Sequence, residues 1–110
     1  MRERDDGGEL AQIWAEHRPL TVERVTVLDR AATAAAAGIL TDQLRDAARR
    51  EAHTLAGSVA IFGFLNASRI AHDLEQRYGA VPPPADAADL AALAAALRDA
   101  IDRPMPRPER

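Results

Sequence analysis

Apolar residues recur every three or four positions in four long stretches of this sequence, a spacing that predicts amphipathic helices. The stretches cover about 20–37, 41–62 and 66–78, followed by a segment that begins at Asp86 and ends before Pro104. The apolar lines of the last three stretches are Leu55, Val59 and Phe62, then Ile70, Leu74 and Tyr78, and then Leu90, Leu93, Leu97 and Ile101. Each of these helices has an apolar face that is stable only when it is buried against another element.

A shorter apolar pattern at 9–17 predicts one more helix, ahead of the four long ones. Pro19 follows it, and proline inside a helix removes a backbone donor and clashes with the preceding turn. We therefore expect Pro19 to separate this short helix from the next. His17 is expected to be an exposed residue near the end of the short helix. Residues 1–8 are charged and contain two glycines, so we expect a flexible N-terminus.

Residues that begin and end helices lie between the long stretches. The candidate N-caps are Thr41, Asn66 and Asp86. The glycines placed to follow helix C-termini are Gly38, Gly63 and Gly79. Three prolines make Val81–Pro84 a linking loop and not a helix, and residues 104–110 form a proline-rich tail. The simplest way to bury four apolar faces is an all-α, antiparallel up-down-up-down four-helix bundle with a short extra N-terminal helix, over residues 9–103.

The length and composition narrow the class of protein. A chain of 110 residues forms one domain. The formal net charge of −3 argues against nucleic-acid binding, which typically uses a basic surface. The absence of cysteine excludes disulfides, thiolate zinc sites and cysteine nucleophiles. The charged start is not a signal peptide, and no apolar run approaches the roughly 20 residues of a membrane span. The lack of cysteine is compatible with a cytoplasmic location, and we expect a cytoplasmic, monomeric protein with no membrane contact.

One face of the helix at 41–62 combines a histidine with very small side chains. Its members are Arg49, His53, Ala56, Gly57 and Ala60. Glycine in a helix interior destabilises the helix by about 1 kcal/mol relative to alanine, so the presence of Gly57 one turn after His53 calls for an explanation. A small residue at this position would allow another molecule to approach the imidazole closely. We expect Arg49, Ala56, Gly57 and Ala60 to form a docking surface for a partner around His53.

The stretch Arg50–Gly63 resembles the signature of histidine-containing phosphotransfer (HPt) domains. That signature is a histidine, an apolar residue two positions later, usually a lysine at the third position, then a glycine, a small residue and a later glycine. The matching residues are His53, Leu55, Gly57, Ser58 and Gly63. Ala56 replaces the lysine, in a chain whose fourteen basic residues are all arginine. His72 and Glu75 lie where the similar phosphotransfer domain of chemotaxis-type histidine kinases has a histidine and a glutamate.

The resemblance implies a phosphoryl carrier of two-component phosphorelays, with His53 as the phosphorylated nucleophile. The partners it implies are the receiver domain of a response regulator, through its aspartate, and the ATP-binding domain of a histidine kinase. The chain has no glycine-rich phosphate loop followed by lysine, so we expect no ATP binding and no kinase activity of its own. We expect no cofactor in the chain, and we expect the partner domain to supply magnesium.

Imidazole is suited to reversible phosphoryl capture. With its ordinary pKa near 6.5 it is about three-quarters neutral at pH 7, so one ring nitrogen can attack phosphorus. The other ring nitrogen should carry the proton and donate it to a carboxylate, which fixes the tautomer and stabilises the developing positive charge. Glu75 is the candidate carboxylate, provided that the two helices are antiparallel neighbours. His72, one turn before Glu75, could hydrogen-bond to the same cluster.

Three alternatives remain open at this point. The first is a helical interaction module that keeps the fold but lacks phosphotransfer, which Ala56 favours. The second is a purely structural, dimerising bundle. The third is a metal site formed by His53, His72 and Glu75, but a carboxylate site in a bundle needs several such ligand pairs and only one is present. We therefore expect no metal.

Overall fold

The structure, a computed structural model, describes residues 2–80 and 86–106, and of residues 2–7 it describes the backbone alone. The predicted loop at 81–84 and residues 107–110 of the predicted tail lie outside the described residues. The helices are α1 (Arg2–Ala36), α2 (Asp42–Ile61), α3 (Leu65–Tyr78) and α4 (Ala87–Ile101). None of these described helices is long and apolar enough to cross a membrane.

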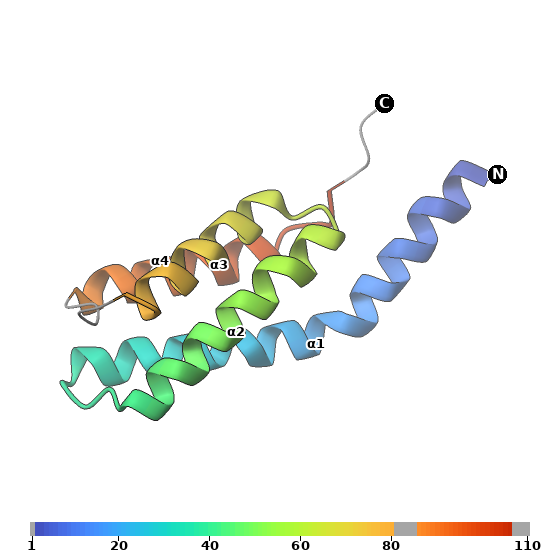
Figure 1. The fold of residues 1–110 in the computed structure, drawn as a ribbon. Coiled ribbons are helices and arrows are strands. Elements are labelled where there is room, and N and C mark those ends of the chain that lie inside the picture. The colour runs from blue at the N-terminus through green and yellow to red at the C-terminus, as the bar shows by residue number, and fades with distance from the viewer. Residues whose placement is uncertain (1, 81–85, 107–110) are drawn as a thin grey trace.

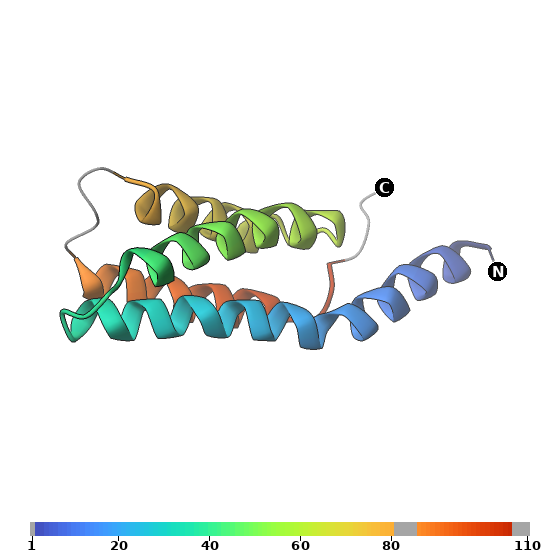
Figure 2. The same ribbon diagram turned by 60° about the horizontal axis from the view of Figure 1, so that its bottom comes forward.

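The helices form an antiparallel up-down-up-down bundle, as predicted (Figure 1). α2 packs on α1 and α3, and α4 completes the bundle by packing on α3 and α1 (Figure 2). The most extensive pairing is between α2 and α3. The molecule measures 54 × 23 × 18 Å, and its long dimension reflects the N-terminal part of α1, which projects beyond the other helices. The bundle architecture is therefore confirmed, and α1 is its longest element.

The prediction of a separate short helix before Pro19 is wrong, because α1 runs through Pro19 without a break. Residues 2–8, expected to be flexible, form the first turns of the same helix. Both sides of the proline are anchored in one core: Trp14 is only 6% exposed, and Val25 is fully buried. Burial on both sides offsets the lost backbone hydrogen bond, and α1 continues with a bend in its N-terminal part (Figures 1 and 2).

Two of the three predicted N-caps are confirmed. The Thr41 side chain accepts a hydrogen bond from the backbone N–H of Leu44, and the Asp86 side chain accepts one from that of Asp89. The prediction for Asn66 is wrong: α3 begins one residue earlier, at Leu65, and Phe64 is its N-cap without a side-chain hydrogen bond. Phe64 is itself buried in the core, and its carbonyl oxygen accepts a hydrogen bond from the backbone N–H of Ser68.

Glycines end the first two helices as predicted. Gly38 and Gly63 have φ angles of 75° and 88°, a region that favours glycine. After α2, the N–H of Gly63 bonds to the carbonyl of Ala60, and that of Phe64 bonds to the carbonyl of Val59. This is the Schellman arrangement, and its two apolar ends, Val59 and Phe64, are both buried. The turn from α2 into α3 is therefore tight, which holds the two helices side by side.

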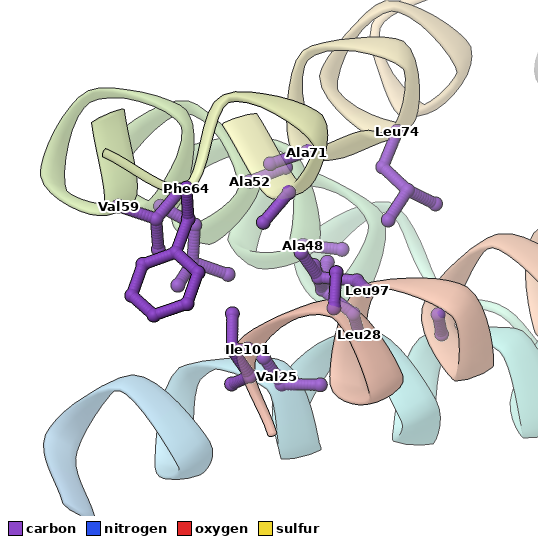
Figure 3. Packing of buried hydrophobic residues seen from close by; sticks show 14 of the residues in the cluster. Val25, Leu28, Ala48, Ala52, Val59, Phe64, Ala71, Leu74, Leu97 and Ile101 are labelled. Atoms are coloured by element: carbon purple, nitrogen blue, oxygen red, sulfur yellow. The ribbon is translucent and has the colours of Figure 1, made fainter. Parts of the chain in front are cut away.

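Small side chains line the contact between α2 and α3. Ala48 and Ala52 of α2 and Ala71 of α3 are fully buried, and Figure 3 shows Ala52 and Ala71 close together in the packed interior. The larger side chains of the core come from all four helices: Val25, Leu28, Leu55, Val59, Leu74, Tyr78, Leu90 and Leu97. Alanine contacts allow helix backbones to approach closely, so side chains on the outward edges of α2 and α3 can reach each other.

Candidate functional site

His53 lies near the middle of α2, on the side that faces away from the core. Leu55 and Val59 of the same helix are fully buried, whereas His53 and Gly57 are exposed. This difference follows from the helical period, which puts residues two positions apart on nearly opposite sides. The His53 side chain is 73% exposed, so a second protein can reach the imidazole.

Glu75 of α3 lies beside the imidazole of His53. The distance between His53 Nδ1 and Glu75 Oε2 is 2.8 Å, a hydrogen bond that joins two residues 22 positions apart. A carboxylate only accepts hydrogen bonds, so this contact favours the tautomer with the proton on Nδ1 and a lone pair on Nε2. The Glu75 side chain is only 20% exposed, so its motion is limited and few water molecules can compete with His53 for the carboxylate. The arrangement leaves Nε2 as the nitrogen available to an incoming electrophile.

His72 reaches the other oxygen of the same carboxylate. Its Nδ1 lies 3.6 Å from Glu75 Oε1, too far for a good hydrogen bond but close enough for an ion pair when His72 is protonated. The His72 side chain is 63% exposed. Among the side chains that the structure describes, no group of three or more His, Cys, Asp or Glu residues is placed to hold a metal ion. Glu75 is thus the residue that links the two histidines.

The small residues of the predicted docking surface lie next to His53. Gly57 is exposed, and a Cβ atom placed on it would meet nothing within 4 Å. Close packing inside the protein therefore does not require a glycine at this position. Ala56 and Ala60 are half-buried along the same side of α2. Together they leave a low surface one to two turns beyond the imidazole.

The charged part of the site lies one turn before His53. Arg49 Nη2 is 3.3 Å from Asp46 Oδ1, and Arg50 donates to the other oxygen of the same carboxylate. The hydrogen bond from Arg49, together with the positive charge of both arginines, holds the pKa of Asp46 below its usual range. The stem of Arg49 also lies across the end of α3, where a Cβ on Gly79 would be 3.1 Å from Arg49 Cδ. Arg49 is therefore held by contacts on two sides.

Sequence reasoning missed two contacts that fix the register of α2 against α3. Ser68 Oγ donates to the carbonyl oxygen of Ala56 at 2.7 Å, and Arg45 Nη1 donates to the carbonyl oxygen of Tyr78 at 2.9 Å. Neither contact has a signal in the sequence, because each depends on which residues the packed helices bring together. The Asp46–Arg50 pair, in contrast, has the i, i+4 spacing of a helical ion pair and could have been found.

The expectation that His17 is exposed near a helix end is wrong. His17 lies within α1 and is half-buried against aromatic residues. Its ring centroid is 5.8 Å from that of Phe62 and 6.4 Å from that of Trp14. Its Nε2 atom is buried without a hydrogen-bond partner among the described residues. Because Pro19 does not end the helix, this half-buried histidine packs at the aromatic end of the bundle.

The comparison with protein families gives one result that covers most of the chain. The family model of the Hpt domain matches residues 15–103, a range that includes His53, His72 and Glu75. No curated protein and no solved structure matches the chain.

Proposed function

Because the chain belongs to the Hpt domain family, whose members carry phosphoryl groups in phosphorelays, we propose that His53 is the residue that accepts and donates the phosphoryl group. The single observation that most supports this proposal is the hydrogen bond between His53 Nδ1 and Glu75 Oε2. This hydrogen bond holds an exposed nucleophile against a carboxylate that accepts the bond and is itself largely buried. His17 lacks such a carboxylate contact among the described residues, and Glu75 lies farther from His72 than from His53.

The transfer step follows from this geometry. The lone pair on His53 Nε2 attacks phosphorus in line with the leaving oxygen of an acyl phosphate on the partner. The P–N bond forms, the P–O bond breaks, and the electron pair of that bond leaves with the partner's carboxylate. The proton stays on Nδ1, whose N–H donates a hydrogen bond to Glu75, and the carboxylate stabilises the positive charge that the ring acquires. The reverse step returns the phosphoryl group to an aspartate.

The partner in this proposal is the receiver domain of a response regulator or the ATP-binding domain of a histidine kinase. Gly57, Ala56 and Ala60 would allow such a domain to approach Nε2, with Arg49 at the edge of the contact. The chain would act as a cytoplasmic monomer without ATP binding of its own. The partner would hold the magnesium ion that neutralises charge on the phosphoryl group. His72 would serve as a secondary hydrogen-bonding group beside Glu75.

One observation favours a second candidate, an interaction module that keeps the fold without phosphotransfer. The position of the usual lysine is occupied by Ala56, which brings no positive charge to the site. In this candidate the same surface around His53 would bind a receiver domain without receiving its phosphoryl group.

A transfer experiment separates the two candidates. Receiver domains from the same organism are phosphorylated, freed of excess donor and mixed with the chain. We expect label to appear on the chain within seconds to minutes, in a form that is stable to base and lost in acid. Binding of a phosphorylated receiver domain without any label on the chain would support the interaction module and contradict phosphotransfer.

A further inference from the structure

The imidazole of His53 depends on Glu75 for its orientation. The side chain of His53 is 73% exposed, and among the described residues the carboxylate of Glu75 is its hydrogen-bond partner, at 2.8 Å. Which ring nitrogen carries the proton is set by the hydrogen bond that the other makes, and an imidazole free in water carries it mainly on Nε2. A proton on Nε2 would occupy the lone pair that attacks phosphorus. The reactive tautomer therefore depends on how α3 presents Glu75 to α2.

The apolar contact between α2 and α3 is built from small side chains at the level of this pair. Ala52 of α2 and Ala71 of α3 are fully buried and lie close together in Figure 3. Alanines let helices approach closely, but their shallow ridges resist sliding less than large interlocking side chains do. A slide of about 2 Å would take His53 Nδ1 and Glu75 Oε2 out of good hydrogen-bonding geometry. Polar contacts across the same interface can therefore decide where Glu75 lies.

One such polar contact lies near the start of α3. Ser68 is half-buried, and its Oγ donates to the carbonyl oxygen of Ala56 at 2.7 Å. A serine hydroxyl has a short reach, so this bond allows little movement of α3 along α2. Ala56 is three residues after His53, and Ser68 is seven residues before Glu75. The bond therefore ties the two helices on one side of the His53–Glu75 pair.

A second polar contact ties the helices at the end of α3. Arg45 Nη1 donates to the carbonyl oxygen of Tyr78 at 2.9 Å. Tyr78 is the last residue of α3, and carbonyls in the last turn of a helix have no partner within it. The guanidinium satisfies such a free acceptor and interacts favourably with the helix dipole. Arg45 thus binds a helix end, and it precedes His53 on α2 by about two turns.

These two contacts lie on opposite sides of the His53–Glu75 pair. The facing residues of the antiparallel helices meet in matching order along their lengths: Arg45 with Tyr78, His53 with Glu75, and Ala56 with Ser68. The outer two contacts are about 16 Å apart along α2 and about 15 Å apart along α3, at the rise of an α-helix. The histidine and the glutamate are therefore held between two fixed points.

From this arrangement we propose that Ser68 and Arg45 are positioning residues, which fix the register of α3 on α2 and so hold the proton of His53 on Nδ1. The consequence for transfer, a free lone pair on Nε2, rests on the proposed phosphorylation of His53. Neither residue touches the phosphoryl group in this account, and both act through Glu75. Loss of either contact would let Glu75 move away from Nδ1, and a larger share of the rings would then carry the proton on Nε2.

Nitrogen-15 NMR of the His53 ring tests the inference without phosphorylation. At about pH 8.5, well above the ordinary pKa of histidine, the ring signals report which nitrogen of the neutral imidazole carries the proton. We expect the proton mainly on Nδ1 in the parent. Ser68→Ala and Arg45→Met each remove one donor, and methionine keeps an apolar stem in place of the arginine. Each should raise the share of the Nε2–H tautomer about two- to fivefold, within the range that the loss of one hydrogen bond predicts.

Phosphoramidate, a small phosphoryl donor, measures the consequence for transfer without a partner protein. The P–N bond of the zwitterionic donor breaks, ammonia leaves, and a bond forms between phosphorus and Nε2, while Nδ1 keeps its proton. We expect Ser68→Ala and Arg45→Met each to slow this reaction about two- to fivefold. Ser68→Thr keeps the hydroxyl and should match the parent. Because both residues act through Glu75, Glu75→Ala should slow the reaction less in either variant than it does in the parent.

Two substitutions on α1 control for a general loss of stability. Arg24→Met removes an arginine bond between helices, the pair with Glu51 at 2.6 Å, and Thr26→Ala removes a hydroxyl-to-carbonyl bond within α1. Neither bond joins α2 to α3. Both variants should lower the free energy of unfolding comparably to the test variants, as urea denaturation measures, yet leave the ring signals of His53 and the phosphoramidate rate unchanged.

The outcomes distinguish the inference from the proposed function. If the parent chain takes no phosphoryl group on His53, the proposed function is contradicted, and the role of these residues in transfer falls with it. If the parent is phosphorylated, but Ser68→Ala and Arg45→Met keep its ring signals and its rate, the inference alone is overturned. Equal changes in the ring signals of Arg24→Met or Thr26→Ala would also overturn it, because the effect would then follow from stability and not from the register of α3.

Discussion

The outward and inward faces of the α2–α3 pair are built from the same two helices, yet they differ in what surrounds each side chain. On the outward face, His53 and His72 are 73% and 63% exposed and share the carboxylate of Glu75. On the inward face, Leu55 and Leu74 are fully buried among apolar residues. The fold depends on the inward face, and the proposed chemistry depends on the outward one. Substitutions on the two faces should therefore affect different measurements.

The largest effect on the fold should come from Leu55→Ala on the inward face. The loss of a fully buried leucine leaves a cavity, and we expect the free energy of unfolding to fall by about 2 to 5 kcal/mol. Urea denaturation measures this change. The exposed neighbour Thr54 is the control, and Thr54→Ala should change stability by less than about 0.5 kcal/mol. Equal stability of the two variants would contradict the assignment of the inward face.

Among substitutions on the outward face, Gly57→Leu should cause the largest loss of phosphoryl transfer. The new side chain would stand one turn from the imidazole and obstruct the partner, lowering transfer at least about a hundredfold, equivalent to about 2.7 kcal/mol in the barrier. The fold should be unchanged or slightly more stable, because the position is open and leucine favours helix. Gly8→Leu, at another exposed helical glycine with open space, is the control. Normal transfer by the Gly57 variant would show that no partner approaches this surface.

Glu75→Ala should slow transfer without abolishing it. The carboxylate orients the ring and stabilises its charge, whereas Nε2 makes the attack, so we expect a loss of about ten- to a hundredfold, or about 1.4 to 2.7 kcal/mol. Rapid-mixing transfer kinetics measure the rate. The control is Glu51→Ala, which removes a carboxylate of α2 that pairs with Arg24 at 2.6 Å and not with a histidine. An unchanged rate in Glu75→Ala would remove the orienting role from this account.

Tyr78→Phe on the inward face should cause the smallest change in the free energy of unfolding at neutral pH. The Tyr78 hydroxyl is buried and has no hydrogen-bond partner among the described residues, so its removal should change stability at pH 7 by at most about 1 kcal/mol. Burial, together with the negative charge of Asp29, raises the pKa of Tyr78 to about 12. This tyrosine is the only one in a chain without lysine.

The sign of the alkaline effect follows from that pKa. Between about pH 10 and 12 the unfolded chain loses the tyrosine proton while the folded chain keeps it, so stability falls as pH rises through this range. The total loss should approach about 2.7 kcal/mol, and Tyr78→Phe should abolish it. Unfolding free energies at pH 8 and pH 11.5 measure the difference. Parallel losses in the parent and the variant would show that another group controls alkaline stability.

The inward face was largely predictable from the sequence. The apolar spacing identified Leu55, Val59, Leu74 and Leu97 as core residues, and Thr41, Asp86 and Gly63 marked helix ends through local geometry. The continuation of α1 through Pro19 could not be predicted in this way. It depends on Trp14 packing on Phe62 and Phe64, with ring centroids 5.0 and 4.9 Å away, which are remote in sequence. Half-burial of His17 has the same non-local origin.

The outward face was predictable only in part. The helical period placed His53 and Gly57 on one side of α2, and the resemblance to HPt domains indicated Glu75. The contact between His53 and Glu75 itself depends on the register of two helices, which alanine packing and the bond from Ser68 to Ala56 establish. The ion pair between Asp46 and Arg50 has a spacing that could have been recognised in the sequence, whereas the packing of the Arg49 stem against Gly79 became visible only in the structure.

The position of the phosphoryl group tests the central claim most directly. The parent chain, His53→Gln, His17→Gln and His72→Gln are each incubated with the same phosphorylated receiver domain, and the label on each chain is measured. We expect His53→Gln to take no label, and His17→Gln to match the parent. We expect His72→Gln to retain labelling, since its histidine only neighbours the carboxylate. Labelling of His53→Gln at the parent's level would contradict the assignment of His53 as the phosphoryl carrier.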